Sequence, residues 1–255
     1  MIDGHCHLDK RIGSCAEAME RLYFEACEAG MQSVILLNIP EIAFDNYEVL
    51  ENTQKYANFF RFFPSFSPVD IKANAELEKL KDMGVSGLKL HPRIHGYYAG
   101  CAESIHLMKK AGELGLPVLV DCFPDGRNIA LGNMPEAFAM IGEQAPETRI
   151  AIGHAGGHRI LDALMVEKFY KNIYLDISFT LLYYRNSSVI QDIAYAIKSS
   201  HAKRIFWGTD YPDRPYKISV DLSRCELENM GVSEEERTAL FYTNAKTFLG
   251  DIKSN

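Results

Sequence analysis

Short apolar runs alternate with amphipathic stretches along the whole chain of 255 residues, and this alternation restricts the fold more than any other feature. Runs such as 118–120 and 150–152 are apolar throughout, as expected of parallel strands that are covered on both faces. Eight such strands, each followed by a segment of helical period, predict an α/β fold of the (β/α)8 or TIM-barrel type, with a doubly wound open sheet as the alternative. The strands are expected at residues 1–5, 32–39, 59–66, 85–90, 116–122, 149–153, 173–177 and 204–208.

Helix signals mark the segments between these strands. Ser14 and Glu17 match a capping box, and Gly30 follows the helix that this box opens. Helices are expected at residues 45–57, 73–83, 102–114, 134–144, 159–170 and 188–200, with two further helical pieces near 218–229 and 234–248. The chain shows no internal repeat and no linker, so we expect one domain over residues 1–255.

The composition excludes several classes of function. The net charge is −7 and the basic residues are scattered, which argues against a nucleic-acid partner. There is no apolar stretch of about 18 residues, so we expect no membrane span. The six cysteines are widely spaced without a C-x-x-C pair, and no secretory signal opens the chain. These features predict a cytoplasmic protein with reduced thiols.

The first predicted strand carries two histidines, and the last one leads to an aspartate. His5 and His7 are two residues apart, so in a strand both side chains point to the same face. Asp210 would bring a carboxylate to the same end of a barrel, although it could also be a cap or turn residue. Two histidines and one carboxylate suit Zn²⁺ or another divalent ion and leave a coordination position open. We expect one such ion per chain, with Asp210 also taking a proton from its water.

Further polar residues follow the middle strands, at the end where barrel enzymes place their sites. His154 ends the sixth strand and is expected to be catalytic. Asp121 ends the fifth strand. It is expected to be a further metal ligand, a substrate contact or a buried acid paired with a neighbour. Lys89 and His91 share one face after the fourth strand, and His158 follows a glycine turn. These last three residues are expected to bind substrate.

Taken in order, five segments and the C-terminal tail resemble the amidohydrolase superfamily, in its amidohydrolase-related (amidohydrolase 2) branch. The segments are residues 2–7, 87–92, 116–120, 152–157 and 207–212, and the tail is 241–249. The resemblance implies a TIM barrel in which His5, His7 and Asp210 hold a divalent metal, usually zinc. It also implies that His154 orients or activates the attacking water or the substrate. Members hydrolyse amide, ester or lactone bonds, and some are non-oxidative decarboxylases of aromatic or unsaturated acids.

The chain departs from this family pattern at one position. Many members end the fifth strand with a histidine that binds metal, whereas this chain has Asp121 there. Either Asp121 binds the metal in place of the histidine, or metal binding is weakened. Some lactone-hydrolysing relatives work without a metal, so weakened metal binding need not abolish activity.

We therefore expect a metal-dependent hydrolase that acts on an amide, ester or lactone carbonyl of a small polar or acidic substrate, working as a monomer or a homodimer. A non-oxidative decarboxylase of the same branch is the first alternative. A TatD-type nuclease is a second, because 5–9 and 209–212 also resemble the ends of that group. A catalytically silent binding barrel is a third. Lys89 also allows a carbamate-bridged site with two metal ions.

Overall fold

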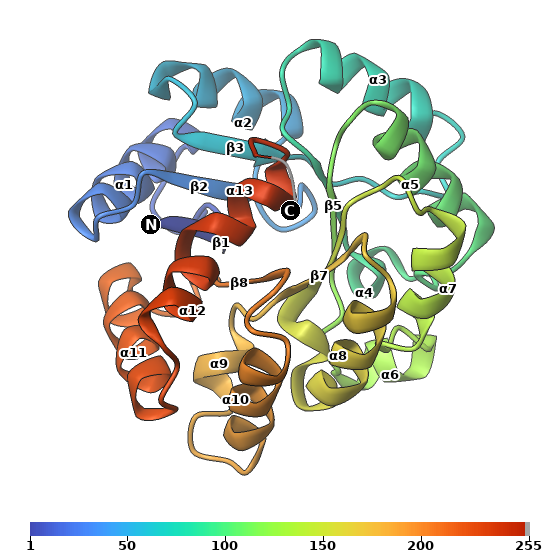
Figure 1. Cartoon of the computed structure of the whole chain (residues 1–255). Helices are drawn as coiled ribbons and strands as arrows, with labels where there is room; N and C mark the ends of the chain where they lie inside the picture. The colour runs from blue at the N-terminus through green and yellow to red at the C-terminus, as the bar shows by residue number, and fades with distance from the viewer. Residues whose placement is uncertain (253–255) are drawn as a thin grey trace.

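The computed structural model describes residues 1–252, and its centre is a ring of parallel strands (Figure 1). Two hydrogen-bonded ladders, β1-β2-β3 and β4-β5-β6-β7-β8, contain the eight strands found in this part of the chain. They are β1 (Ile2–Cys6), β2 (Ser33–Leu37), β3 (Phe60–Phe63), β4 (Leu88–Leu90), β5 (Val118–Val120), β6 (Ile150–Ile152), β7 (Ile173–Asp176) and β8 (Ile205–Phe206).

Isolated parallel bridges join the two ladders at both seams. Ser65, just after β3, pairs with Lys89 of β4, and Cys6 of β1 pairs with Tyr211 beyond β8. The Gly4 amide also donates to the Trp207 carbonyl at 2.9 Å. The strands thus close on themselves, which confirms the predicted α/β barrel over the open sheet.

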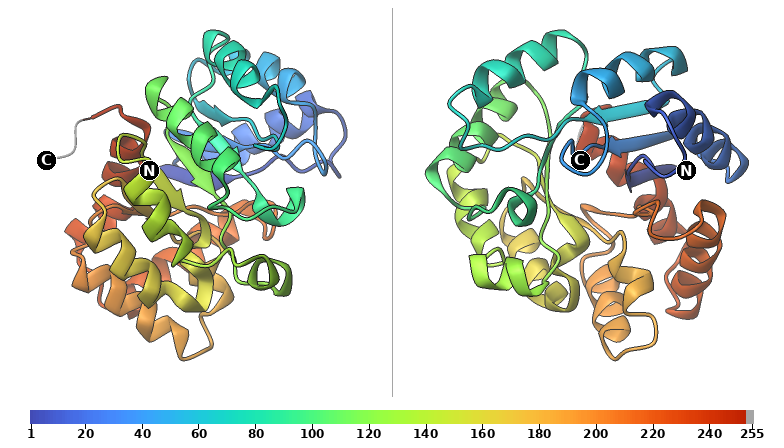
Figure 2. Two further views of the ribbon diagram at one scale, coloured as in Figure 1. Left: turned by 90° about the vertical axis from the view of Figure 1, so that its right-hand side faces the viewer. Right: turned by 180° about the vertical axis from the view of Figure 1, so that it is seen from behind.

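Most helices lie around the outside of the strands (Figures 1 and 2), whereas α13 (Asn244–Leu249) lies across one end of the barrel. The capping box predicted at Ser14 and Glu17 is present and begins the first of them. The main helices are α1 (Cys15–Glu28), α2 (Asn46–Thr53), α3 (Ala73–Asp82), α5 (Ala102–Glu113), α7 (Ala137–Gln144), α8 (Ile160–Phe169), α10 (Val189–Ser199), α11 (Tyr216–Asn229), α12 (Glu234–Thr238) and α13 (Asn244–Leu249). No helix among the described residues is both long and apolar enough to cross a membrane.

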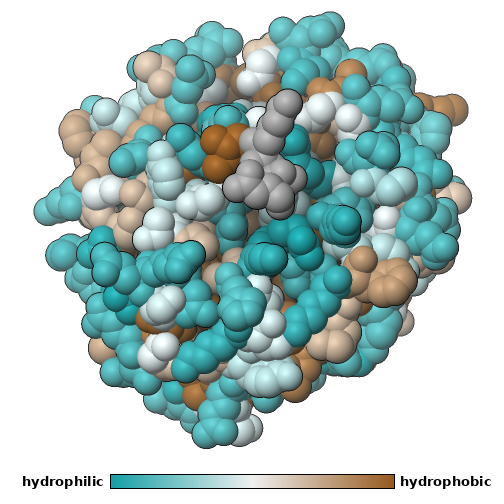
Figure 3. Space-filling view, viewed as in Figure 1, coloured by the Kyte–Doolittle hydropathy of each residue, from teal (hydrophilic) through white to brown (hydrophobic). Residues whose placement is uncertain are grey.

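The barrel interior is filled by side chains and closed at one end by the C-terminal helix. Leu119, Ala151 and Phe206 belong to this inner cluster, and Phe248 of α13 stacks on Phe206 with ring centroids 5.1 Å apart. Figure 1 shows α13 lying across this end of the barrel, and the surface seen from that side is mainly hydrophilic (Figure 3). The functional residues are therefore expected at the opposite side of the barrel, at the carboxyl ends of the strands.

Three short helices stand in links that the sequence pattern left without structure. They are α4 (Pro92–His95), α6 (Gly126–Leu131) and α9 (Thr180–Tyr183), which follow β4, β5 and β7. The Asp125 side chain caps α6 by accepting from the amides of Arg127 and Asn128. The expected C-terminal helix is also divided, because a π-helical turn at Ala239–Thr243 separates α12 from α13.

Candidate active site

His5, His7 and Asp210 meet at the seam between the first and last strands. Two backbone hydrogen bonds of 2.8 Å set their positions, from the Asp210 amide to the His5 carbonyl and from the His7 amide to the Tyr211 carbonyl. The two Nε2 atoms lie 3.2 Å apart, and Oδ1 of Asp210 lies 3.2 Å from the His5 Nε2 and 3.5 Å from the His7 Nε2. The three donor atoms form a nearly regular triangle.

The other ring nitrogens fix which atoms of the two histidines face this triangle. Nδ1 of His7 donates to the Leu37 carbonyl at 2.8 Å, and Nδ1 of His5 lies 2.5 Å from Oδ2 of Asp176. Burial lowers the pKa of His5 well below its ordinary value, which favours a neutral ring. In neutral rings with protonated Nδ1, both Nε2 atoms carry lone pairs. Two lone pairs and a carboxylate oxygen therefore converge without a proton between them.

This arrangement fits a divalent metal ion. Tetrahedral Zn²⁺ takes nitrogen and oxygen ligands at about 2.0–2.1 Å, which places neighbouring ligand atoms about 3.3 Å apart. The three measured separations lie close to that value. His7 is the most exposed of the three, with 21% of its side chain accessible, so the fourth direction is open to a water or substrate.

A buried carboxylate ties the seam together beneath the triangle. Oδ1 of Asp3 accepts from the amides of His5 and Thr209 at 3.0 and 2.9 Å. Its Oδ2 accepts from the Thr209 hydroxyl at 2.6 Å and from the Tyr216 hydroxyl at 2.8 Å. Burial raises the pKa of Asp3 to about 6 against the effect of these donors. Gly208 allows the close approach, since a Cβ there would lie 2.6 Å from the His5 backbone nitrogen.

Asp176 and Ser178 link the triangle to His154, and sequence reasoning missed both residues. The Ser178 hydroxyl donates to Oδ2 of Asp176 at 2.9 Å and lies 3.0 Å from Nδ1 of His5. Nδ1 of His154 lies 3.1 Å from the Ser178 carbonyl and 3.3 Å from its hydroxyl. The protonated Nδ1 of His154 thus faces Ser178. The position of Asp176, at the end of a buried strand, was the one available signal.

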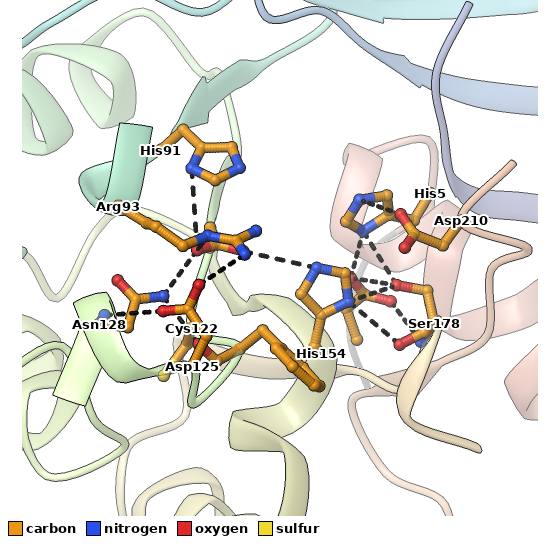
Figure 4. Close-up of polar contacts among 12 residues, drawn as sticks. His5, His91, Arg93, Cys122, Asp125, Asn128, His154, Ser178 and Asp210 are labelled. Atoms are coloured by element: carbon orange, nitrogen blue, oxygen red, sulfur yellow. Dashed lines mark hydrogen bonds and ion pairs between the residues drawn. The ribbon is translucent and has the colours of Figure 1, made fainter. Parts of the chain in front are cut away.

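Asp121 lies apart from the triangle. It contacts His91, Arg93 and Asn128, which stand on the far side of His154 from His5 and Asp210 (Figure 4). Its Oδ2 accepts from Nδ2 of Asn128 at 2.8 Å and forms an ion pair with Nε of Arg93 at 3.4 Å. Its Oδ1 lies 3.5 Å from Nε2 of His154 and has no hydrogen-bond partner. The candidate metal groups found among the described residues do not include Asp121. Arg93 and Asn128 stand on α4 and α6, where no sequence motif marked them.

The remaining predicted substrate residues are divided between this group and the surface. His91 is buried, with Nδ1 3.8 Å from Oδ2 of Asp121, and Lys89 is buried on β4. His158 is exposed, and its Nδ1 lies 3.4 Å from the Tyr184 hydroxyl. The structure thus places Lys89 and His91 in the interior near Asp121, and His158 at the outer edge.

Charges within the site shift several pKa values. Burial acts to raise the pKa of Asp121, but His91, His154, Arg93 and Lys89 together hold it below its ordinary value. Burial likewise opposes ionisation of Asp210, yet the nearby histidines lower its pKa. Burial lowers the pKa of His91 to about 3 and also lowers that of Lys89. Asp121 and Asp210 are therefore carboxylates at neutral pH, and His91 is neutral.

Three residues at this site have a left-handed backbone. His154, Phe179 and Asp210 have φ values of 56°, 58° and 54°, a region that side chains other than those of glycine, asparagine and aspartate seldom occupy. For His154 and Phe179 this conformation costs about 1–3 kcal/mol each and persists only where the surroundings enforce it. Here two of the three residues, His154 and Asp210, belong to the candidate site.

Apolar side chains and aromatic rings border the space around the triangle of donor atoms. A cavity of about 270 Å³ adjoins His7 and is lined partly by apolar side chains, among them Leu8, Ile39 and Ile42. Aromatic rings stand beside His154: the centroids of Phe123 and Phe179 each lie 5.9 Å from its ring centroid. A small molecule at the triangle would therefore contact apolar groups near His7 and aromatic groups near His154.

Comparisons with known proteins agree with this architecture. A TIM-barrel protein of Bordetella bronchiseptica has a TM-score of 0.81 at 18% identity, over 98% of both chains. A probable 2-pyrone-4,6-dicarboxylic acid hydrolase of Acinetobacter baumannii, with citric acid bound, has a TM-score of 0.71 at 16% identity over 98% of both chains. A Burkholderia multivorans amidohydrolase with bound zinc has a TM-score of 0.68 at 13% identity over 98% of both chains. No curated protein matches the chain in sequence. The family model Amidohydrolase matches residues 2–250, and the chain therefore belongs to this amidohydrolase family.

Proposed function

We propose that this chain is a hydrolase that binds one divalent metal ion, Zn²⁺ or a similar ion, through His5, His7 and Asp210. The observation that carries the proposal is the triangle of two Nε2 atoms and Oδ1 with sides of 3.2 to 3.5 Å. Without a cation, two lone pairs and a carboxylate would repel one another at this distance. When bound, a divalent ion would lower the pKa of a water in its open position to about 7.

Two residues of the chain would then act on the reacting groups: Asp210 would accept a proton, and His154 would stabilise an oxyanion. Asp210 points one oxygen at both histidines, and its other oxygen is free to take a proton from the attacking water. His154 keeps its Nδ1 on Ser178 and turns Nε2 toward Asp121, beside the triangle. With a proton on both ring nitrogens, His154 would donate a hydrogen bond from Nε2 to a carbonyl oxygen placed there as negative charge develops on that oxygen.

The surroundings favour a small substrate with a carboxylate or another polar anionic group. Arg93 is 31% exposed and lies on the same side of His154 as His91 (Figure 4). Lys89 is buried on β4, the strand that precedes both residues, so the β4 side of the site is rich in cationic and donor groups. The carbonyl to be attacked would lie at the triangle, as in amide, ester or lactone hydrolysis. The apolar cavity beside His7 would hold the rest of the molecule.

Non-oxidative decarboxylation is the second candidate. A structure of 2,6-dihydroxybenzoate decarboxylase with bound 2,6-dihydroxybenzoate shares the fold, with a TM-score of 0.66 at 17% identity. In this case the protonated form of His154 would deliver a proton to carbon as the carboxyl group leaves. The aromatic rings beside His154 suit a flat substrate of that kind.

A panel assay with the zinc-loaded protein tests the proposal. We expect turnover of at least one lactone, ester or amide that carries a carboxylate, and loss of that turnover in Asp210→Asn. Asp192→Asn is the matched control, because Asp192 lies in the first turn of α10. Release of carbon dioxide from carboxylated aromatics, without hydrolysis of any ester or amide, would contradict the hydrolase proposal and support the decarboxylase. No turnover in either set would contradict both.

A further inference from the structure

The helix α8 exposes apolar side chains on the outside of the barrel. Leu161, Met165 and Phe169 are 40%, 55% and 78% exposed. The opposite face of the helix is also apolar, and its Ile160 and Leu164 are fully buried against the barrel. A helix of the outer ring normally presents polar groups to water, as α1 does with residues 17, 20 and 21. A helix with apolar side chains on two opposite faces is expected to be covered on both.

The exposed face of α8 is symmetric about its central residue. Leu161 and Phe169 lie four positions before and after Met165, which is about 6 Å along the helix in each direction. Asp162 and Lys168 lie three positions before and after it, with opposite charges. All five side chains fall within about 60° of Met165 around the helix axis. This pattern is complementary to an antiparallel copy of itself.

We propose that α8 forms the centre of a homodimer in which two copies of this helix pack antiparallel across a two-fold axis at Met165. The axis would place each Leu161 beside the partner's Phe169. It would bring each Asp162 to the height of the partner's Lys168, within reach of the long lysine side chain. An isologous contact of this kind requires a self-complementary surface, and a different partner protein would not require the symmetry about Met165.

The charged groups are already held beside the apolar residues. Oδ2 of Asp162 lies 2.7 Å from Nη2 of Arg159, and Nζ of Lys168 donates to the Ser199 hydroxyl at 2.6 Å. They would form a polar border around an apolar centre, which is the usual anatomy of a stable interface. Because α8 stands in the outer ring of helices, the strand ends and the candidate metal site stay outside this contact.

The mass of the protein in solution is the first test. We expect light scattering at micromolar concentration to give twice the mass of one chain. Met165→Glu would place two carboxylates together at the axis, and we expect it to give a monomer with unchanged circular dichroism. Phe24→Glu is the matched control, since Phe24 is 60% exposed on α1, and it should leave the dimer intact. A monomeric parent protein, or a folded Met165→Glu dimer, would overturn the proposal.

Crosslinking tests the geometry independently. In a background with the exposed Cys27 and Cys225 changed to serine, Met165→Cys should form a covalent dimer on mild oxidation. Only a residue near a two-fold axis can form a disulfide with its own copy. Phe24→Cys in the same background should remain uncrosslinked. A protein that is dimeric in solution but not crosslinked through position 165 would have its interface elsewhere.

Exchanging the charges separates a second copy from an unrelated partner. Asp162→Lys and Lys168→Asp should each raise the dimer dissociation constant several-fold, because each puts like charges at the same height twice per dimer. The double variant Asp162→Lys/Lys168→Asp should return the constant to near the parent value. Failure of the double variant to recover, with both single variants folded, would contradict the antiparallel arrangement.

Discussion

Nδ1 of His5 lies 2.5 Å from Oδ2 of Asp176, and this contact sets the direction of the ring at the candidate metal site. The Ser178 hydroxyl and amide both donate to Asp176, so that the carboxylate is itself held in place. A carboxylate behind a metal-binding histidine fixes its tautomer and raises its basicity. Asp176 thus prepares His5 to present Nε2 to a cation.

Replacing Asp176 should weaken metal binding without removing a ligand. We expect Asp176→Asn to lower the affinity for Zn²⁺ by about 10- to 100-fold, because the amide orients His5 less strongly. Competition with a chromophoric chelator measures this change. Asp192→Asn, on α10, should leave the affinity as it is. An unchanged affinity in Asp176→Asn would show that the contact with His5 has no part in binding the ion.

Asp121 should behave differently from a metal ligand. Asp121→Asn keeps the shape but removes the charge that pairs with Arg93, so we expect a loss of about 1–3 kcal/mol in the free energy of unfolding. The metal content should stay at the parent level, because Asp121 stands outside the triangle. Elemental analysis together with urea unfolding checks both parts. Loss of the metal from a folded Asp121→Asn protein would contradict this prediction and show that Asp121 takes part in metal binding.

The close approach of β8 to β1 should depend on Gly208. A Cβ at this position would lie 2.6 and 2.7 Å from the nitrogen and Cβ of His5, and these atoms cannot move without displacing β1. We expect Gly208→Ala to cost about 1–3 kcal/mol of stability and to weaken metal binding. Gly126→Ala is the control, because a Cβ there meets nothing within 4 Å. Equal stability of the two variants would contradict the close packing of this seam.

His91 should make stability depend on pH in the acid range. Burial lowers its pKa from 6.5 to about 3 in the folded chain, so the unfolded chain binds the proton more readily. The stabilisation from neutral His91 is therefore complete above pH 6.5 and is lost as the pH falls toward 3. Between these values, the free energy of unfolding should fall more steeply in the parent than in His91→Asn. Parallel pH profiles from urea titrations would contradict a buried neutral His91.

The alternation of apolar and amphipathic segments was enough to predict the barrel, because each strand and its helix form one local pattern. The spacing of His5 and His7 predicted that both point to one space, and the structure brings them to Asp210 across the closing seam. Asp176 and Ser178 could not be predicted, because a single carboxylate after a strand carries no spacing signal. Arg93 stands on the short helix α4, which Pro92 begins and Gly96 ends, and a single turn is too short to show a helical period in the sequence.

Titration of Zn²⁺ into chelator-treated protein tests the central claim most directly. Isothermal calorimetry should show one site per chain, and the site should be lost in His5→Ala and in His7→Ala. His106→Ala should keep it, because His106 is exposed on α5, away from the strand seam. Absence of zinc binding to the folded parent protein, or binding that survives in both His5→Ala and His7→Ala, would contradict the account.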